Sequence, residues 1–201
     1  GQKNVGILLP STVAGALANL AATFSGRTSV SLNFTSGAAN IASAVLQAGL
    51  TTVLTSRAFM GKMKIELPED VKVLWIEDIA SSIRLPEKVA AFVLAVCAPK
   101  RLLEIACGAE ERITVNDTVT IIFSSGSTGY PKGGMRSHAN IVANVDGIAQ
   151  VTRVNEEDRL LGILPLFHSF GYTALWCGSN RDLATIFYPN PLDAGTVGEL
   201  F

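Results

Sequence analysis

The sequence predicts an α/β fold in which layered, parallel-rich sheets are flanked by helices. In the first half of the chain, short runs rich in β-branched residues alternate with stretches of helical periodicity. This order favours parallel strands that are joined by right-handed helical crossovers. The chain has 201 residues, of which 48% are hydrophobic and 16% charged, so it can bury a large core and differs from disordered sequences.

Four strands are predicted before residue 80. The apolar, β-branched runs that indicate them are 4–10, 29–34, 51–56 and 71–78. Helices are predicted between the first three of these strands. Ser11 is placed to cap a helix over Val13–Phe24, and Ser36 is placed to cap a second helix that ends at Gly49.

Residues 84–107 have helical character that is interrupted at Pro99. Within them, 89–98 is the most apolar run of the chain, but ten residues cannot span a bilayer, which needs about 20. Two interpretations stay open for this run. It forms either a buried core helix or a helix that touches a membrane face with its flanking cations near the headgroups.

A charged, turn-rich connector over 108–117 predicts a subdomain boundary. It would divide a first, partial α/β subdomain, 1–107, from the start of a second, truncated one, 118–201. The second part also contains a helix that is capped by Ser137 and begins near His138. Its other predicted elements are strands at 118–123, 160–167 and 184–189, a glycine-rich loop at 124–132 and a short helix at 169–177.

Charge and cysteine usage narrow the class of protein. Sixteen basic and 17 acidic residues give a formal net charge of -1, which excludes the basic field that nucleic-acid binding needs. The first residues do not have the pattern of a signal peptide, so a cytoplasmic protein is expected. Cys97, Cys107 and Cys177 lack metal-ligand spacing and are interpreted as reduced thiols that act as small buried hydrophobes.

The glycine-rich loop that follows the strand 118–123 has the chemistry of a polyphosphate cradle. Its glycines let backbone N–H groups turn inward. The hydroxyls of Ser125, Ser127 and Thr128 can donate to phosphate oxygens, and Lys132 adds a mobile positive charge. A Walker loop is excluded because no Gly-Lys-Ser/Thr follows. The other interpretation left open is a long flexible hairpin turn.

Two stretches carry a family resemblance. FSSGSTGYPKG, at 123–133, resembles the phosphate-loop signature of the acyl-adenylate-forming superfamily, which includes acyl-CoA and acyl-carrier-protein synthetases. LPLFHSFG, at 164–171, is similar to the aromatic–histidine motif beside the acid pocket of that superfamily. Over 32–59, and in FYPNPL at 187–192, the chain most resembles the synthetase half of bifunctional 2-acylglycerophosphoethanolamine acyltransferase/acyl-acyl carrier protein synthetases.

The resemblance implies an incomplete part of the large N-terminal domain of an adenylate-forming enzyme that uses ATP and Mg²⁺. A fatty acid would attack the α-phosphate of ATP to give acyl-AMP, and the thiol of CoA or of acyl carrier protein would then take the acyl group. The bifunctional relatives add acylation of lysophosphatidylethanolamine and contact with the inner face of a membrane. Their remaining site residues lie on later chain, so these 201 residues are expected to be inactive alone. A non-catalytic nucleotide- or acyl-binding module is the alternative.

The resemblance also assigns roles to single residues. Lys132 would act on the pyrophosphate, Thr128 would lie near Mg²⁺, and His168 would approach the carboxylate and the α-phosphate, the alternative for His168 being a core histidine. The expected phosphate-binding residues are Ser124, Ser125, Gly126, Ser127, Thr128, Gly129 and Lys132. The expected acid-binding residues are Phe167, His168, Phe170 and Gly171. Thr128, Gly134 and Arg136 depart from the residues usual in these relatives.

Overall fold

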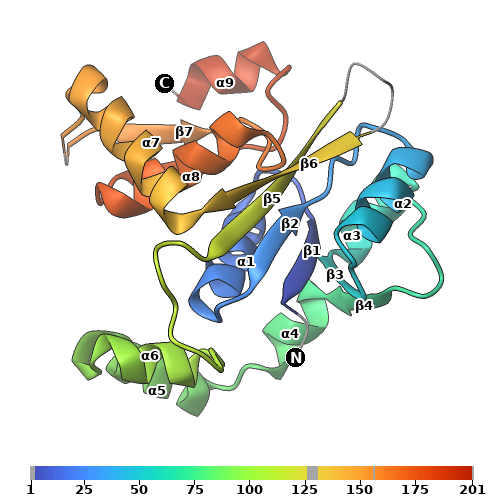
Figure 1. Ribbon diagram of the computed structural model, residues 1–201. Helices are drawn as coiled ribbons and strands as arrows, with labels where there is room; N and C mark the ends of the chain where they lie inside the picture. The colour runs from blue at the N-terminus through green and yellow to red at the C-terminus, as the bar shows by residue number, and fades with distance from the viewer. Residues whose placement is uncertain (1–2, 126–130, 156, 201) are drawn as a thin grey trace.

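The computed structural model describes residues 3–125, 131–155 and 157–200, and a six-stranded sheet lies at its centre (Figure 1). Five strands are parallel, in the order β4-β3-β1-β2-β5, and β6 pairs with β5 in the antiparallel direction. The predicted layered α/β fold is confirmed. The strands of this sheet are β1 (Asn4–Leu8), β2 (Thr28–Ser31), β3 (Thr52–Thr55), β4 (Lys72–Trp75), β5 (Thr118–Ser125) and β6 (Pro131–Ser137).

Two further strands, β7 (Arg159–Gly162) and β8 (Ala184–Phe187), form a separate parallel pair. The strand predicted over 160–167 is therefore shorter than expected. Beyond Gly162 the chain leaves the sheet and turns, and the Ser11 hydroxyl donates to the carbonyl of Leu164 at 2.7 Å. This contact ties the segment before the histidine motif to the end of β1.

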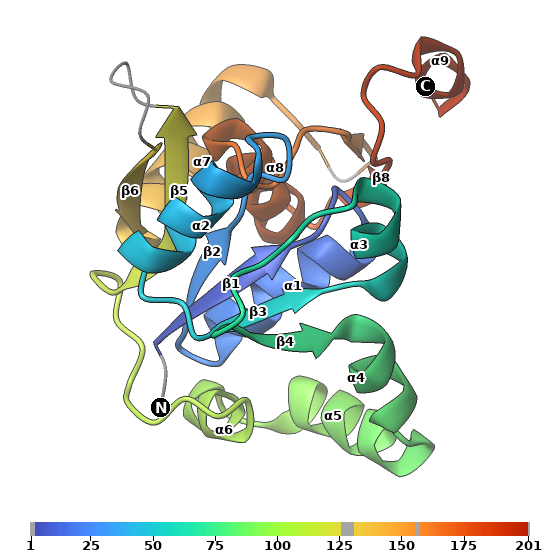
Figure 2. The same ribbon diagram turned by 90° about the vertical axis from the view of Figure 1, so that its right-hand side faces the viewer.

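Helices cover both faces of the central sheet. Figures 1 and 2 show α2 and α3 on one face and α1, α7 and α8 on the other. The helices are α1 (Val13–Phe24), α2 (Ala38–Gln47), α3 (Arg57–Met63), α4 (Ile76–Ser82), α5 (Leu85–Cys97), α6 (Lys100–Ala106), α7 (His138–Thr152), α8 (Ser169–Asn180) and α9 (Ala194–Leu200).

The two layers follow from side-chain alternation along β5. Ile121 and Phe123 pack against the core formed with α2, whereas Ile122 packs on the opposite face with Ile141 of α7 and Tyr172 of α8. Successive side chains of a strand point to opposite faces, so one apolar strand supplies both cores. The subdomain boundary at 108–117 stays a prediction, and β5, which follows it, pairs with β2, which precedes it.

Buried hydroxyls connect β2 to β5. Thr28 donates to the carbonyl of Thr118 at 2.8 Å, and Thr120 donates to the carbonyl of Ser29 at 2.9 Å. The Ser29 hydroxyl lies 3.3 Å from the Tyr172 hydroxyl of α8. Each buried hydroxyl therefore has a partner, as a low-dielectric interior requires, and these bonds join the chain across about 90 residues of sequence.

Two predicted helix caps are wrong by one residue. The α1 helix is capped by Thr12, whose hydroxyl accepts a bond from the Gly15 amide, while Ser11 makes the contact with Leu164 instead. The α2 helix begins after Gly37, whose φ of 82° suits a residue without Cβ. The cap at Ser137 is confirmed, and α7 begins at His138.

Three expectations about the middle of the chain are also corrected. The strand predicted over 71–78 ends at Trp75, and α4 begins at Ile76. The run 89–98 is not a buried core helix, because α5 has no buried residue. Cys97 and Cys107 are exposed, so the prediction of buried thiols is wrong for both, and Cys177 is half-buried. Among the described residues, none of the helices has the length and apolar character needed to cross a bilayer.

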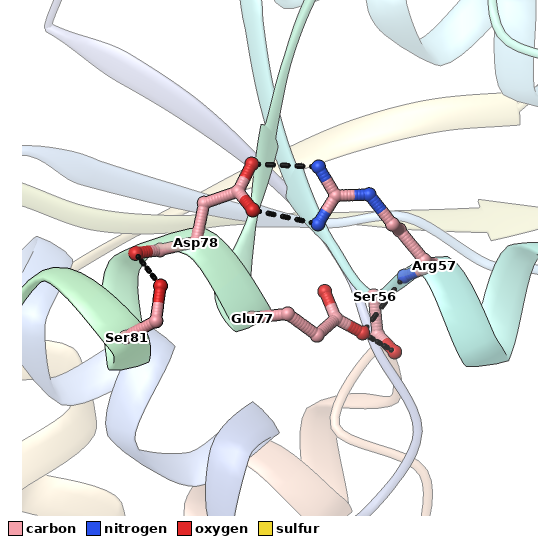
Figure 3. Close-up of polar contacts among 5 residues, drawn as sticks. All are labelled: Ser56, Arg57, Glu77, Asp78 and Ser81. Carbon is pink, nitrogen blue, oxygen red and sulfur yellow. Dashed lines mark hydrogen bonds and ion pairs between the residues drawn. The ribbon is translucent and has the colours of Figure 1, made fainter.

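Polar side chains tie α3 to α4 at the carboxyl ends of β3 and β4 (Figure 3). The two terminal nitrogens of Arg57 each donate to one carboxylate oxygen of Asp78 at 2.7 Å. Glu77 accepts from the Ser56 hydroxyl at 2.7 Å and from the Arg57 amide at 2.9 Å, so its carboxylate lies at the start of α3. An anion at a helix N-terminus is favourable.

These contacts make the stability of the fold depend on pH. The hydrogen bond from Ser56 lowers the pKa of Glu77, and the hydrogen bond from Arg57 lowers the pKa of Asp78. Because its folded-state pKa is lowered, each ionised carboxylate stabilises the fold at pH values above its ordinary pKa, which is 4.5 for Glu77. This stability is lost as the pH falls through the folded-state pKa. We expect the Glu77→Gln/Asp78→Asn variant to melt up to about 4 °C below wild type at pH 7, because the pairs are surface-exposed.

The gap between variant and wild type should narrow as the pH falls from 7 toward 3, since protonation progressively removes the same interactions from wild type. Thermal melts at both pH values test this. Glu66→Gln, at an exposed position, is the control and should follow wild type throughout. An equal gap between variant and wild type at both pH values would contradict the assignment.

Candidate active site at the carboxyl ends of the strands

The hairpin of β5 and β6 places Ser124 opposite Lys132. The register pairs these two residues directly, and Ser125 pairs with Pro131, so residues 126–130 connect the two strands. Ser124 and Lys132 are both exposed. A hydroxyl and a cation therefore stand side by side where the glycine-rich loop begins and ends.

The alternation of side chains along the two strands decides which face of the sheet Ser124 and Lys132 share. Directly paired residues lie on the same face of a sheet, and so do residues two apart. Ser124 and Lys132 thus share the face of Ile122, which packs against α7 and α8. The sequence did not reveal this face, because Pro131–Ser137 was not predicted to be a strand.

Gly133 lies in tight contact with side chains of β5. A Cβ at this position would lie 3.1 Å from the Phe123 ring and 3.0 Å from Ile121 Cγ2. The glycine after Lys132 therefore leaves room for the aromatic residue that begins the motif. A Cβ on Gly134, by contrast, would meet only the guanidinium of Arg136, a flexible group.

Gln47 holds the point where the loop rejoins the sheet. Its side-chain amide, at the end of α2, donates to the carbonyl of Pro131 at 3.0 Å and to the Ser43 hydroxyl at 2.9 Å. Sequence reasoning missed this contact. No local pattern could reveal it, because Gln47 and Pro131 are 84 residues apart.

His168 lies immediately before α8, with its side chain exposed. Its amide donates to the carbonyl of Pro165 at 3.0 Å, and its carbonyl accepts from the Tyr172 amide at 2.9 Å. The chain thus turns at 165–168 and passes directly into the helix. The alternative of a core histidine is wrong, because the imidazole is exposed.

A series of aromatic rings in contact with one another packs against His168. The buried Phe167 ring lies 4.7 Å from the imidazole and makes an edge contact with Phe34 at 5.0 Å. Phe34, in the loop after β2, makes a second edge contact with Phe59 of α3, also at 5.0 Å. Such edge contacts are favourable arrangements of aromatic pairs, so the carboxyl edge of the sheet fixes the start of α8. Phe34 and Phe59 were not predicted as part of the site.

A cavity of about 310 Å³ lies between the hairpin and the two helices. Ile122 and Arg136 line it from the sheet, and Ser169 and Thr173 line it from α8. Asn144 of α7 also lines it and donates to the Thr173 hydroxyl at 3.2 Å. Arg136, which follows the first sequence motif, and Ser169, which belongs to the second, therefore face one space.

The remaining predicted site residues have different surroundings. Gly126, Ser127, Thr128 and Gly129 lie outside the described residues, and nothing is described of the Ser125 side chain. Phe170 is 63% exposed, whereas Phe167 is buried. Gly171 is also buried. The expected contribution of these three residues to acid binding stays a prediction.

Gly171 has a clear packing role. A Cβ there would lie 2.2 Å from the carbonyl oxygen of Pro165, part of the turn that presents His168. We expect Gly171→Ala to destabilise the fold by about 2 to 3 kcal/mol, because the clash is with backbone and cannot be relieved by a side-chain rotation. Thermal or denaturant unfolding measures the change.

Gly147 of α7 is the matched control, because a Cβ added there meets nothing within 4 Å. Gly147→Ala should leave stability unchanged or raise it by up to about 1 kcal/mol, as expected for alanine in a helix. Equal effects of the two substitutions would show that Gly171 is not a packing requirement.

The donor groups of the described residues determine whether the candidate site could hold a metal ion. Within 3–125, 131–155 and 157–200, no group of three or more His, Cys, Asp or Glu side chains could hold a metal ion. Mg²⁺ commonly binds through one or two protein ligands together with substrate phosphates. The exposed hydroxyl and cation of Ser124 and Lys132 have the chemistry to contact such a phosphate group.

Sequence comparison gives the family of this chain. The chain matches the AMP-binding enzyme family over residues 1–199 and belongs to it. Superfamily membership, suspected from the two motifs, is thereby confirmed. The narrower resemblance to acyl-acyl carrier protein synthetases stays a prediction.

Curated relatives include CoA ligases from plants. The 4-coumarate–CoA ligase 5 of Oryza sativa subsp. japonica is 32% identical over 186 residues, which cover 90% of this chain and 32% of the relative. The peroxisomal OPC-8:0-CoA ligase 1 of Arabidopsis thaliana is 39% identical over 72 residues, which cover 34% of this chain and 13% of the relative. The chain spans about a third of the length of the curated relatives that it matches over most of its own length.

Solved structures share the fold. O-succinylbenzoate coenzyme A synthetase from Bacillus subtilis, in complex with ATP and a magnesium ion, has a TM-score of 0.74 at 20% identity over 100% of this chain and 48% of that one. The N-terminal domain of FACL13 from Mycobacterium tuberculosis has a TM-score of 0.73 at 22% identity over 99% of this chain and 47% of that one. At these identities the likeness establishes the architecture alone.

Proposed function

We propose that this chain supplies the nucleotide-phosphate and carboxylate-binding part of an AMP-forming acid–thiol ligase. A carboxylate oxygen attacks the α-phosphorus of ATP, the bond to pyrophosphate breaks, and acyl-AMP forms. A thiol sulfur then attacks the acyl carbon, and AMP leaves. The observation that carries the proposal is that Ser124 and Lys132 share the face of the hairpin on which α8, the helix that follows His168, packs.

Phosphate binding is assigned to the loop 124–132. Lys132 neutralises charge that builds up on the departing pyrophosphate, and Ser124 donates a hydrogen bond beside it. In this proposal the cradle also takes hydroxyl and backbone N–H donors from four motif residues, Ser125, Gly126, Ser127 and Gly129. This chemistry requires mainly positioning and charge neutralisation.

His168 is assigned to the reacting carboxylate. An exposed imidazole at the start of α8, fixed by Phe167, can donate a hydrogen bond to one of two anions that otherwise repel each other. Thr128 is assigned to Mg²⁺, which when bound neutralises phosphate charge. The assignment of Phe167, Phe170 and Gly171 to the acid-binding wall is part of the same proposal.

The substrate proposed is a fatty acid, and the acceptor is the thiol of CoA or of acyl carrier protein. CoA is supported by the relatives named as CoA ligases. Acyl carrier protein, and a coupled acylation of lysophosphatidylethanolamine at the cytoplasmic face of a membrane, rest on the resemblance over 32–59 and 187–192. The division into subdomains on either side of 108–117 belongs to the same proposal.

ATP–pyrophosphate exchange tests the function. The protein at its natural length should show exchange that depends on a fatty acid, ATP and Mg²⁺, whereas the 201-residue chain should show none above background. Positioning depends on all contacts acting together, and the chain spans about a third of its relatives. Nucleotide binding without exchange by the natural-length protein would instead favour a non-catalytic binding module.

A further inference from the structure

The α5 helix presents its most apolar side to solvent. Leu85, Val89, Phe92 and Val96 recur at spacings of three and four, so they form one stripe along the helix. Leu85 is 73% exposed, Phe92 is 70% exposed and Val96 is 69% exposed. A single exposed apolar residue needs no explanation, but a continuous stripe marks an interaction surface.

The α6 helix extends the same surface. Leu102 and Ile105 are about half exposed, while Glu104 is buried and accepts a bond from Arg101 at 3.1 Å. Figures 1 and 2 place α5 and α6 together at the lower end of the molecule, whereas β5 runs toward the upper end. This surface, the α5–α6 face, is therefore separate from the candidate active site.

Cations border the α5–α6 face. Arg84 and Lys88 lie at the start of α5 and Lys100 lies at the start of α6, and none of the three has an ion-pair partner within 4 Å among the described residues. The acidic groups of these helices are engaged elsewhere. Glu87 accepts from the Arg84 amide at 2.7 Å, and Glu104 is buried.

We propose that the α5–α6 face binds the surface of an anionic lipid bilayer. Apolar side chains would enter the boundary between headgroups and acyl chains, and the bordering cations would lie at the level of the anionic headgroups. At 1.5 Å per residue, the 13 residues of α5 extend about 20 Å, so the helix lies along the membrane and does not cross it. This inference is independent of the proposed adenylation.

A second copy of the chain fits this face less well. Two such faces packed together would bring Arg84, Lys88 and Lys100 of one copy close to the same cations of the other. Glu87 is the exposed carboxylate of the two helices, so positive charge is in excess on this face. An anionic bilayer supplies more opposite charge than a second copy does.

Sedimentation with vesicles tests the proposal on the 201-residue chain. We expect it to bind vesicles of phosphatidylcholine with 30% phosphatidylglycerol, to bind pure phosphatidylcholine much more weakly, and to dissociate in high salt. Phe92→Ser/Val96→Ser and Lys88→Glu/Lys100→Glu should each lower the partition coefficient about tenfold or more. Circular dichroism and melting should stay unchanged, because these side chains are exposed.

Matched variants control for general effects of apolarity and charge. Val151→Ser/Leu192→Ser removes two apolar residues elsewhere that are even more exposed, and Lys62→Glu/Lys64→Glu reverses two exposed cations of α3 and its C-cap. Both should bind like wild type. Failure of wild type to bind anionic vesicles, or equal losses in control and test variants, would overturn the proposal. A dimer in sedimentation velocity that Phe92→Ser/Val96→Ser abolishes, without vesicle binding, would show a second copy as the occupant.

Discussion

Lys132→Ala in the natural-length protein is expected to slow fatty-acid-dependent ATP–pyrophosphate exchange by about ten- to a thousandfold. The side chain is exposed on the edge strand β6, opposite Ser124, so its removal leaves the core intact and the melting temperature should change little. The loss arises because a phosphate charge that builds up during the reaction is left without its partner.

Two further variants sharpen this test. Lys132→Arg keeps the charge but replaces a compact ammonium with a planar group, so it should restore only part of the activity. Lys62→Ala removes an exposed lysine from α3 and should leave exchange unchanged. If Lys132→Ala shows normal exchange kinetics, the loop 124–132 does not hold the phosphates.

His168→Ala is expected to slow the formation of acyl-AMP by about a hundredfold or more, the usual effect of removing a donor that stabilises a developing charge. The imidazole is exposed, so the melting temperature should stay close to wild type. Single-turnover measurement of acyl-AMP separates this step from thioester formation. His168→Asn, which keeps a neutral donor, should recover part of the rate.

The second histidine offers a contrast, because His138 begins α7 and is half-buried. Burial lowers the pKa of His138, and the nearby Asp117 opposes this effect. His138→Ala should therefore affect stability more than acyl-AMP formation. If His168→Ala instead melts several degrees lower while adenylation is normal, the role of His168 is structural.

The early strands and the motif strand could be predicted because their signals are local. β-branched runs predicted β1, β2, β3 and most of β5. Ser137, as a capping residue, predicted the start of α7. Charge and hydroxyl chemistry likewise point to Lys132 and the serines of the loop, whose phosphate-binding role stays a prediction. These features depend on residues that are neighbours in sequence.

The β6 strand could not be predicted, because PKGGMRS contains residues with little strand preference. It is a strand because it pairs with the edge of the sheet that β5 offers and because the Phe123 ring covers Gly133. The same holds for α4. Its first turn carries Glu77, whose carboxylate caps α3, a contact 21 residues distant in sequence. Tertiary pairing decided both elements.

The exposure of α5 was left open by the sequence for a different reason. An apolar run of ten residues has the same composition whether it faces a protein core or an outside surface, so periodicity cannot decide between them. The supports of the site, Gln47, Phe34 and Phe59, escaped notice because each acts across a long sequence separation.

The hydroxyl-linked pairing of β2 with β5 has a consequence for the order of assembly. Thr120 is 91 residues from its partner Ser29, whereas β1 to β4 all lie within the first 75 residues. During synthesis, a nascent chain can close its first four strands before 118–125 has emerged from the ribosome. Such an intermediate would lack the hairpin of β5 and β6 and would leave the edge of β2 open to other strands. Formation of this hairpin therefore also ends exposure to aggregation.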